Sequence, residues 1–201
     1  MTTDPLHNDK AGLRSRLLTE RRALAAGARE VAAAALALHA LELAEPAGVV
    51  AAYVSVGAEP GTGPLLDALL DRGVRVLLPV LLPDNDLDWA EYTGADQLEA
   101  AARGLREPTG PRLGPQAVTG VGLVLLPGLA VDRRGVRLGR GGGSYDRVLA
   151  RLAAARAEPF LATLLYDHEL LGEVPAEPHD LPVHAVVTPS GVVRFPAGGG
   201  R

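Results

Sequence analysis

The chain has 201 residues, 47% of them hydrophobic and 22% charged, with a formal charge of −4. This composition is typical of a globular protein with a substantial core, and the acidic balance argues against nonspecific nucleic-acid or membrane surfaces. The lack of cysteine excludes disulfides and thiolate metal sites. The sequence MTTDPLHNDK lacks the apolar run of a signal peptide, and no stretch approaches the roughly 20 apolar residues of a membrane span. We therefore expect a cytoplasmic protein with one domain over residues 1–201.

The first quarter of the chain predicts two helices. Leucines recur at helical spacing among charged residues between positions 13 and 24, and Gly27 interrupts the pattern. From position 28 an alanine-rich run predicts a second helix that ends before Pro46. We expect the helices within residues 1–45 to pack on a sheet formed by the rest of the chain, and residues 197–201 to fray.

A strand–helix–strand unit follows these helices. Residues 49–56 form an apolar run of strand length, residues 65–72 read as a helix that ends at Gly73, and residues 74–80 read as the next strand. Two strands joined through a helix are the usual component of a parallel sheet.

The second half of the chain continues this alternation. Residues 94–120 are rich in glycine and proline and predict a loop with a short helix near 96–103, whereas the continuous apolar run 121–127 is typical of a strand buried on both faces. The remaining predicted elements are a helix from about Ser144 to Arg156 and strands at 87–92, 160–166, 184–188 and 192–195. The pattern predicts an α/β fold, a three-layer open and mostly parallel sheet with helices on both faces. Ligands bind such sheets beyond the carboxyl ends of the strands.

The segment between the strand 121–127 and the helix at Ser144 is the most informative. Its glycines stand at positions 128, 135, 139, 141, 142 and 143, and its arginines at 133, 134, 137 and 140. Glycine lets backbone amides approach an anion, and consecutive amides at a helix N-terminus form an anion pocket. The segment therefore predicts a phosphate-binding loop, although it has neither P-loop nor GxGxxG spacing. The alternative is a flexible surface loop, which the clustered arginines disfavour.

This segment, PGLAVDRRGVRLGRGGGSYDRVL, resembles the signature of the 5-formyltetrahydrofolate cyclo-ligases, also called methenyltetrahydrofolate synthetases. The resemblance extends over the chain, because Lys10–Arg14, Glu59–Thr62, Glu107–Pro108 and Asp180 match further family positions. It implies a Rossmann-like sheet and the ATP-dependent conversion of 5-formyltetrahydrofolate to 5,10-methenyltetrahydrofolate. In that reaction the formyl oxygen attacks the γ-phosphate of ATP, and a second folate nitrogen then displaces the phosphorylated oxygen.

The resemblance assigns Lys10 and Arg14, one helical turn apart, to the ATP phosphates; a solvated helix face is the alternative. The ATP-binding residues that it implies in the loop are Arg137, Leu138, Gly139, Arg140, Gly141, Gly142, Gly143, Ser144 and Tyr145. Arg137 and Arg140 are the predicted catalytic residues, because fixed positive charge stabilises the transferred phosphoryl group.

Two carboxylates resemble the Mg²⁺ ligands of the family, Asp146 and Asp180. One or two carboxylates together with substrate phosphates are a usual Mg²⁺ site. The alternative for Asp146 is an acid in the first turn of a helix, where it complements the helix dipole.

The folate-binding residues implied by the resemblance are Val54, Glu59, Arg140, Gly141, Gly142, Gly143 and Ser144. A carboxylate at position 59 can accept paired hydrogen bonds from the amino-pyrimidine edge of a pterin; a surface acid at a strand end is the alternative. Further candidates are Trp89, Tyr92 and Tyr145 for ring stacking, with core packing as the alternative, and Glu107, which either faces substrate or marks a turn. The chain departs from the family at Ser144, where a tyrosine is usual, and at Pro60.

Three functions stay open at this point. The first is an active cyclo-ligase that uses ATP and Mg²⁺, acts on a reduced formyl folate and is monomeric. The second is a noncatalytic folate- or nucleotide-binding relative, which the serine at position 144 motivates. The third is a sugar-phosphate isomerase or related enzyme on a similar sheet, which needs neither Lys10 nor Mg²⁺.

Overall fold

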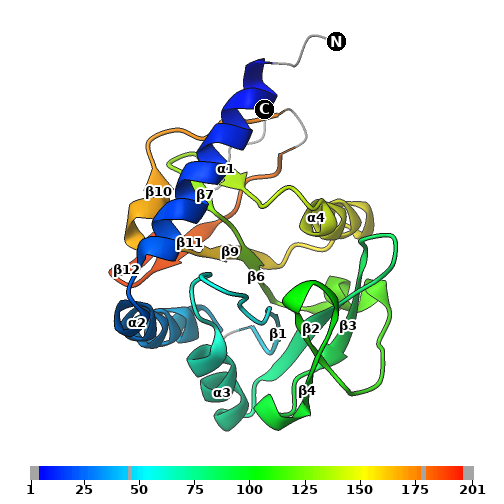
Figure 1. Ribbon diagram of the computed structural model, residues 1–201. Coiled ribbons are helices and arrows are strands. Elements are labelled where there is room, and N and C mark those ends of the chain that lie inside the picture. The colour runs from blue at the N-terminus through cyan, green and yellow to red at the C-terminus, as the bar shows by residue number, and fades with distance from the viewer. Residues whose placement is uncertain (1–4, 45–46, 178–179, 197–201) are drawn as a thin grey trace.

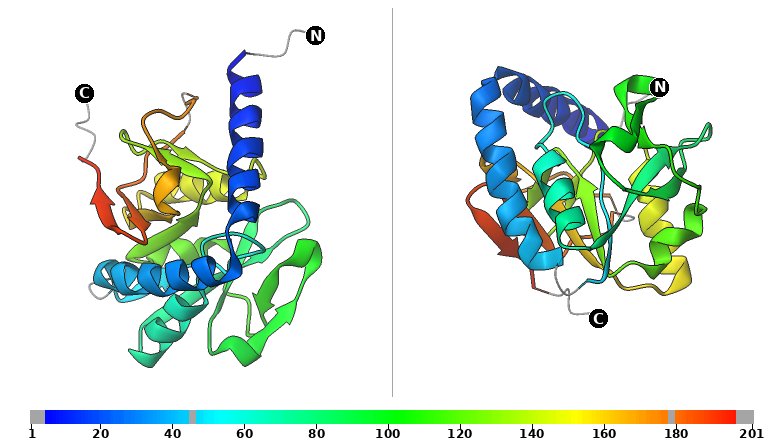
Figure 2. Two further views of the ribbon diagram at one scale, coloured as in Figure 1. Left: turned by 60° about the vertical axis from the view of Figure 1, so that its left-hand side comes forward. Right: turned by 90° about the horizontal axis from the view of Figure 1, so that it is seen from below.

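The computed structural model describes residues 5–44, 47–177 and 180–196, so the predicted fraying of 197–201 concerns residues outside this description. The chain bends by 105° between helices α1 (Pro5–Ala23) and α2 (Ala26–Ala44). The sharp change of direction can be seen in Figure 2. The break between them precedes Gly27, which lies in the first turn of α2, so the predicted break at this glycine is wrong by a few residues. Within the described ranges no single helix is long and apolar enough to cross a membrane; α1 from Lys10 and α2 pass that test only as a bent pair.

The main sheet has seven strands among the described residues, in the order β12-β11-β9-β6-β1-β2-β3. Their bounds are β1 (Val49–Ala51), β2 (Arg75–Leu81), β3 (Leu87–Glu91), β6 (Leu123–Pro127), β9 (Phe160–Leu164), β11 (Ala185–Thr188) and β12 (Gly191–Arg194). The five inner strands pair in parallel, and β3 and β12 add antiparallel edges. Counted along the chain, the parallel strands have the doubly wound order 2-1-3-4-5, whose switch point lies between β1 and β6.

Helices cover both faces of this sheet, as the sequence predicts (Figure 1). Leucines of α2 and α3 (Gly63–Asp71) pack with one face, and those of α4 (Ser144–Ala155) pack with the other together with Val118 of the 3-10 helix η3 (Pro115–Gly120). The crossovers through α3 and α4 run in opposite directions from the switch point. Right-handed crossovers in opposite directions place their helices on opposite faces.

Two segments differ from the sequence prediction. The helix expected near 96–103 is instead a pair of strands, β4 (Leu98–Ala100) and β5 (Arg106–Pro108), flanked by the 3-10 turns η1 (Ala95–Gln97) and η2 (Ala102–Gly104). The turn is sharp because Arg103 and Gly104 both have positive φ. Strand β1 is shorter than the predicted 49–56, because the chain leaves the sheet after Ala52 and forms a loop at the switch point.

A second, smaller sheet supports α1 and was not predicted. It consists of β7 (Ala130–Asp132), β8 (Arg137–Leu138) and β10 (Leu170–Leu171), in the order β10-β7-β8. Leu17 of α1 packs on this sheet in a small apolar cluster with Leu129, Ala130, Leu138 and Val174. Figure 1 shows α1 lying across β7. The glycine- and arginine-rich segment is therefore partly a hairpin that lies beneath a helix.

Candidate active site

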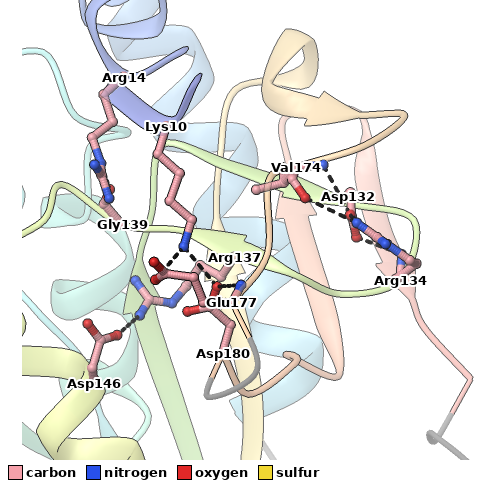
Figure 3. A network of polar contacts seen from close by, with 10 residues as sticks. All are labelled: Lys10, Arg14, Asp132, Arg134, Arg137, Gly139, Asp146, Val174, Glu177 and Asp180. Atoms are coloured by element: carbon pink, nitrogen blue, oxygen red, sulfur yellow. Dashed lines mark hydrogen bonds and ion pairs between the residues drawn. The ribbon is translucent and has the colours of Figure 1, made fainter. Parts of the chain in front are cut away.

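The site lies where two segments meet. One is the β1 loop, between β1 and α3, and the other is the β6 loop, between β6 and α4, which contains β7 and β8. Arg140, in the β6 loop, donates through Nη1 to Glu59 Oε1 of the β1 loop at 3.0 Å. Helix α1, and Glu177 and Asp180 from a later segment, add further groups, as Figure 3 shows. Four segments that are distant in sequence therefore converge at the switch point, which is the ligand position expected for this topology.

Helix α1 directs Lys10 and Arg14 toward this site (Figure 3). The Lys10 ammonium donates to Glu177 Oε2 at 2.9 Å and to Asp180 Oδ2 at 3.0 Å, and Arg14 Nε donates to the Gly139 carbonyl at 2.9 Å. Burial acts to lower the pKa of Lys10, but the bonds to the two carboxylates outweigh it and raise the pKa. Neither side chain lies on a solvated helix face, since Lys10 is 6% exposed and Arg14 is bonded to the glycine loop.

Arg137 is a deeply buried cation at the base of the loop. Its Nη1 donates to the Pro127 carbonyl at 3.0 Å and its Nη2 to Asp146 Oδ1 at 3.0 Å, while its Nε is buried with no partner among the described residues. The side chain is only 7% exposed, whereas that of Asp146 is 61% exposed. Burial lowers the pKa of Arg137, and Asp146 only partly offsets this. A buried guanidinium with so little compensation favours an additional anion nearby.

The glycines of the loop shape its backbone around these cations. Gly141 and Gly143 have positive φ, and a Cβ on Gly141 would lie 3.6 Å from Cζ of Arg14. Gly143 is the N-cap of α4, so the first amides of that helix follow directly after the loop. A Cβ on Gly142 would have open space around it. This backbone is suited to an approaching anion.

The flanking residues differ in their surroundings. The Leu138 side chain is 1% exposed in the core under α1, so this predicted ATP ligand can offer only its backbone, whose carbonyl accepts from Leu129 N at 2.7 Å. Ser144 begins α4 and is partly buried. The Tyr145 hydroxyl is buried without a partner among the described residues, and burial with the charge of Glu59 raises its pKa.

Asp132 ties the hairpin to the segment that carries Asp180. This carboxylate is fully buried and accepts from the backbone N–H groups of Arg134, Val136 and Val174 at 2.8, 3.1 and 3.1 Å. Arg134 also donates to it through Nε and Nη2, as Figure 3 shows. Burial acts to raise the pKa of Asp132, but these hydrogen bonds outweigh it and lower the pKa. The buried carboxylate of Asp132 therefore fixes the turn that precedes Arg137.

The two predicted Mg²⁺ ligands line one hollow. Arg137, Asp146 and Asp180 surround a cavity of about 150 Å³ together with Leu149, Ala150 and Leu181. Asp146 is paired with Arg137, and Asp180 with Lys10, so both carboxylates already lie beside a cation. Among the described residues no three acidic, histidine or cysteine side chains form a metal cluster of their own. Two carboxylates fit a Mg²⁺ ion that takes its other ligands from phosphate and water.

The size of a hollow does not identify the site. A larger and more open hollow of about 550 Å³ runs along the outer side of α4, lined by Gln116, Arg147, Ala150, Arg151, Ala154 and Ala155. None of the predicted binding residues lies there. We therefore place the site at the smaller hollow, where the predicted charges converge.

The β1 loop supplies the predicted folate side. Val54 is partly buried against the core, and Glu59 accepts from Val56 N at 2.8 Å through Oε2 while Oε1 meets Arg140. The Thr62 hydroxyl accepts from Ser55 N at 2.9 Å and so braces the loop. Thr62 stands at the N-cap of α3 without capping it through its side chain.

Three further candidates do not reach the site. Trp89 is fully buried in the core, and Tyr92 is 3% exposed with its hydroxyl bonded to Asp67 at 2.7 Å, which with burial raises its pKa to about 12. Glu107 lies in strand β5 and accepts from Leu81 N, in the last residue of β2, at 2.9 Å. Trp89 and Tyr92 therefore show the core packing named as their alternative, whereas Glu107 does not mark a turn.

Sequence reasoning missed two features. Glu177, the second partner of Lys10, lies three residues before Asp180, a spacing that carries no signal in a proline-rich loop. Arg21 forms a buried ion pair with Glu169 beneath the site. Arg21 could have been noticed, because it continues the helix face that carries Lys10 and Arg14.

The fold and these charges define a doubly wound α/β protein with a glycine- and arginine-rich loop at its switch point. Residues 6–189 match the model of the 5-formyltetrahydrofolate cyclo-ligase family, and the chain belongs to this family. It is 45% identical over 192 residues to the 5-formyltetrahydrofolate cyclo-ligase of Mycolicibacterium smegmatis, covering 92% of this chain and 97% of that one. It is 34% identical over 148 residues to the Escherichia coli K12 enzyme of the same name, covering 73% and 80%. The structure matches that of Aquifex aeolicus 5,10-methenyltetrahydrofolate synthetase with a TM-score of 0.79 and 27% identity, over 96% of this chain and 95% of that one.

Proposed function

We propose that this protein is a 5-formyltetrahydrofolate cyclo-ligase that uses ATP and Mg²⁺ to form 5,10-methenyltetrahydrofolate, ADP and phosphate. The observation that carries the proposal is that Arg137, Asp146 and Asp180 line one hollow, with Lys10 paired to Asp180. Arg140, which follows Arg137 in the same loop, pairs with Glu59. We propose further that residues 1–201 act as one unit, because Lys10 of α1 pairs with Asp180 at the hollow and Arg140 pairs with Glu59 of the β1 loop.

The residues divide into a phosphate side and a folate side. On the phosphate side Lys10, Arg14 and Arg137 meet the ATP phosphates together with amides of the glycine loop. The formyl oxygen attacks the γ-phosphorus and ADP leaves; the second folate nitrogen then attacks the formyl carbon and phosphate leaves. The buried guanidinium of Arg137 stabilises charge on the transferred phosphoryl group, because it is already oriented and poorly solvated.

Asp146 and Asp180 would hold the Mg²⁺, which neutralises phosphate charge when bound. Lys10 now pairs with Asp180 and would be placed to contact a phosphate oxygen if that carboxylate held the ion. Glu59 orients the pterin through paired hydrogen bonds, and Arg140 lies between the pterin and the phosphates.

The test is turnover followed by the ultraviolet absorbance of the methenyl product. Protein with 5-formyltetrahydrofolate, ATP and Mg²⁺ should produce it, and mixtures without ATP or with EDTA should not. Folded protein that binds ATP and folate without releasing phosphate would instead indicate a noncatalytic relative. Activity that survives EDTA and a Lys10→Ala substitution would indicate isomerase-type chemistry.

A further inference from the structure

Helix α1 carries a third cation on the face that holds Lys10 and Arg14. Lys10, Arg14, Leu17 and Arg21 follow one another at spacings of four, three and four residues, which places them within roughly 60° of one helix face. Leu17 and Arg21 are each 1% exposed. Lys10 and Arg14 reach the site itself, whereas Arg21, near the other end of the helix, has no place in the proposed chemistry.

Glu169 and a backbone carbonyl hold the Arg21 guanidinium. Nε donates to Glu169 Oε1 at 2.6 Å, and Nη2 donates to Oε2 at 2.8 Å and to the Gly128 carbonyl at 2.6 Å. Burial acts to lower the pKa of Arg21, but its bonds to Glu169 outweigh this and raise the pKa. Gly128 directly follows the last residue of β6, so Arg21 fixes α1 to the first residue of the β6 loop.

The same ion pair reaches the folate side through Tyr166. Glu169 Oε2 also accepts from Tyr166 N at 2.9 Å, and Arg21 Cζ lies 5.9 Å from the centre of the Tyr166 ring. The Tyr166 hydroxyl lies 3.4 Å from the Ala58 carbonyl oxygen and 3.3 Å from that of Glu59, and donates to them. One buried pair thus connects α1, the glycine loop and the loop of the predicted folate ligand.

We propose that Arg21 and Glu169 are positioning residues for both substrates, an inference that rests on the function proposed above. A buried ion pair often adds little net stability compared with apolar residues of similar volume. What the pair supplies is geometry, since the two-pronged contact of a guanidinium with a carboxylate fixes direction as well as distance. The ion pair fixes the rotation of α1 about its axis, and therefore the direction in which Lys10 and Arg14 point. Tyr166 fixes the position of the backbone at Glu59 through its contact with the Glu59 carbonyl.

The experiment compares wild-type protein with Arg21→Lys and Glu169→Gln. Lysine keeps the positive charge but cannot make the two-pronged contact with Glu169. The KM for ATP and the KM for 5-formyltetrahydrofolate should therefore each rise about tenfold. The kcat should change by less than about twofold, because Arg137 and Asp146 keep their own partners. The Kd for ATP, measured by calorimetry, should rise with KM.

The matched control is Leu17→Ala, on the same helix face between Arg14 and Arg21. It removes apolar packing without touching the polar links, so it should lower Tm and leave both KM values within about twofold of wild type. The inference is overturned if Arg21→Lys lowers Tm but leaves both KM values unchanged. It is also overturned if Leu17→Ala raises the two KM values as much as Arg21→Lys does. If Arg21→Lys does not fold, Glu169→Gln decides, because it nearly preserves the buried volume; unchanged KM values there overturn the inference too. A wild-type protein without turnover would instead contradict the proposed function, and the Kd for ATP then tests Arg21 alone.

Discussion

The two loops that meet at the switch point are built differently. In the β6 loop the charged groups are fixed by buried partners: Arg137 by the Pro127 carbonyl and Asp132 by three backbone N–H groups. The β1 loop is braced mainly by short-range bonds, such as that from Val56 N to Glu59. Its direct side-chain link to the β6 loop is Arg140, whose side chain is 54% exposed, and Tyr166 with the buried Arg21–Glu169 pair connects its backbone to Gly128. The phosphate side is therefore preorganised, while the contact between Glu59 and Arg140 can change without disturbing its buried partners.

Among the substitutions considered, Arg137→Ala in the preorganised loop should lower kcat/KM the most. Loss of one oriented donor to a developing charge costs about 2.7–4 kcal/mol in the barrier, so kcat/KM should fall about 10²–10³-fold. Steady-state absorbance of the methenyl product measures this. The matched control is Arg133→Ala, an exposed arginine of the same segment, which should leave kcat/KM nearly unchanged. Equal losses in the two variants would mean that only the net charge of the loop matters.

Asp132→Asn tests whether the rigidity of the β6 loop comes from its buried carboxylate. An amide cannot accept all the hydrogen bonds that Asp132 accepts, so the free energy of unfolding should fall by about 1–3 kcal/mol. The native pKa of Asp132 lies below its ordinary value of about 3.9, so its contribution is present above that pH and is lost as the pH falls through the native pKa. Denaturant unfolding at neutral pH and below pH 4 measures both effects.

The difference between wild type and Asp132→Asn should therefore shrink on acidification. The exposed Asp96, replaced in the same way, provides the control and should show neither the loss nor the pH dependence. A difference that stays constant down to the lowest pH at which the protein folds would contradict the proposed role of the ionised carboxylate.

Glu59→Gln should sharpen the contrast between the loops, because it changes the folate side and its contact with Arg140 while the buried partners of Arg137 and Lys10 stay in place. The variant loses the charge that pairs with the amino-pyrimidine edge, so KM for 5-formyltetrahydrofolate should rise about tenfold, or about 1.4 kcal/mol. The KM for ATP should stay near that of wild type, since Arg137 and Lys10 have other partners. Glu99→Gln, an exposed acid remote from the loop, is the control. A parallel rise in both KM values would show that the loops are not independent.

The sequence predicted the layers of the fold and a glycine-rich loop between β6 and α4, because apolar runs and clustered glycines are local signals. It could not predict contacts between distant segments. Lys10 meets partners 167 and 170 residues away, and Arg21 meets one 148 residues away. Trp89 was a ring-stacking candidate because aromatic residues are scarce, yet strand β3 buries it completely in the core. Spacing along one helix locates a face, and only the folded chain shows what that face meets.

Ser144→Tyr is the mildest change and tests how freely the folate side can vary. Tyrosine is the family's usual residue here, and Ser144 begins α4 directly beside the glycine loop. An added ring can stack on a flat substrate, so KM for 5-formyltetrahydrofolate should fall roughly threefold, about 0.6 kcal/mol. The KM for ATP should not change, because the backbone of Gly143 already sets the start of the helix. Ser144→Leu, which adds bulk without an aromatic face, is the matched control. If leucine lowers the folate KM as much as tyrosine does, apolar contact rather than stacking determines affinity at this position.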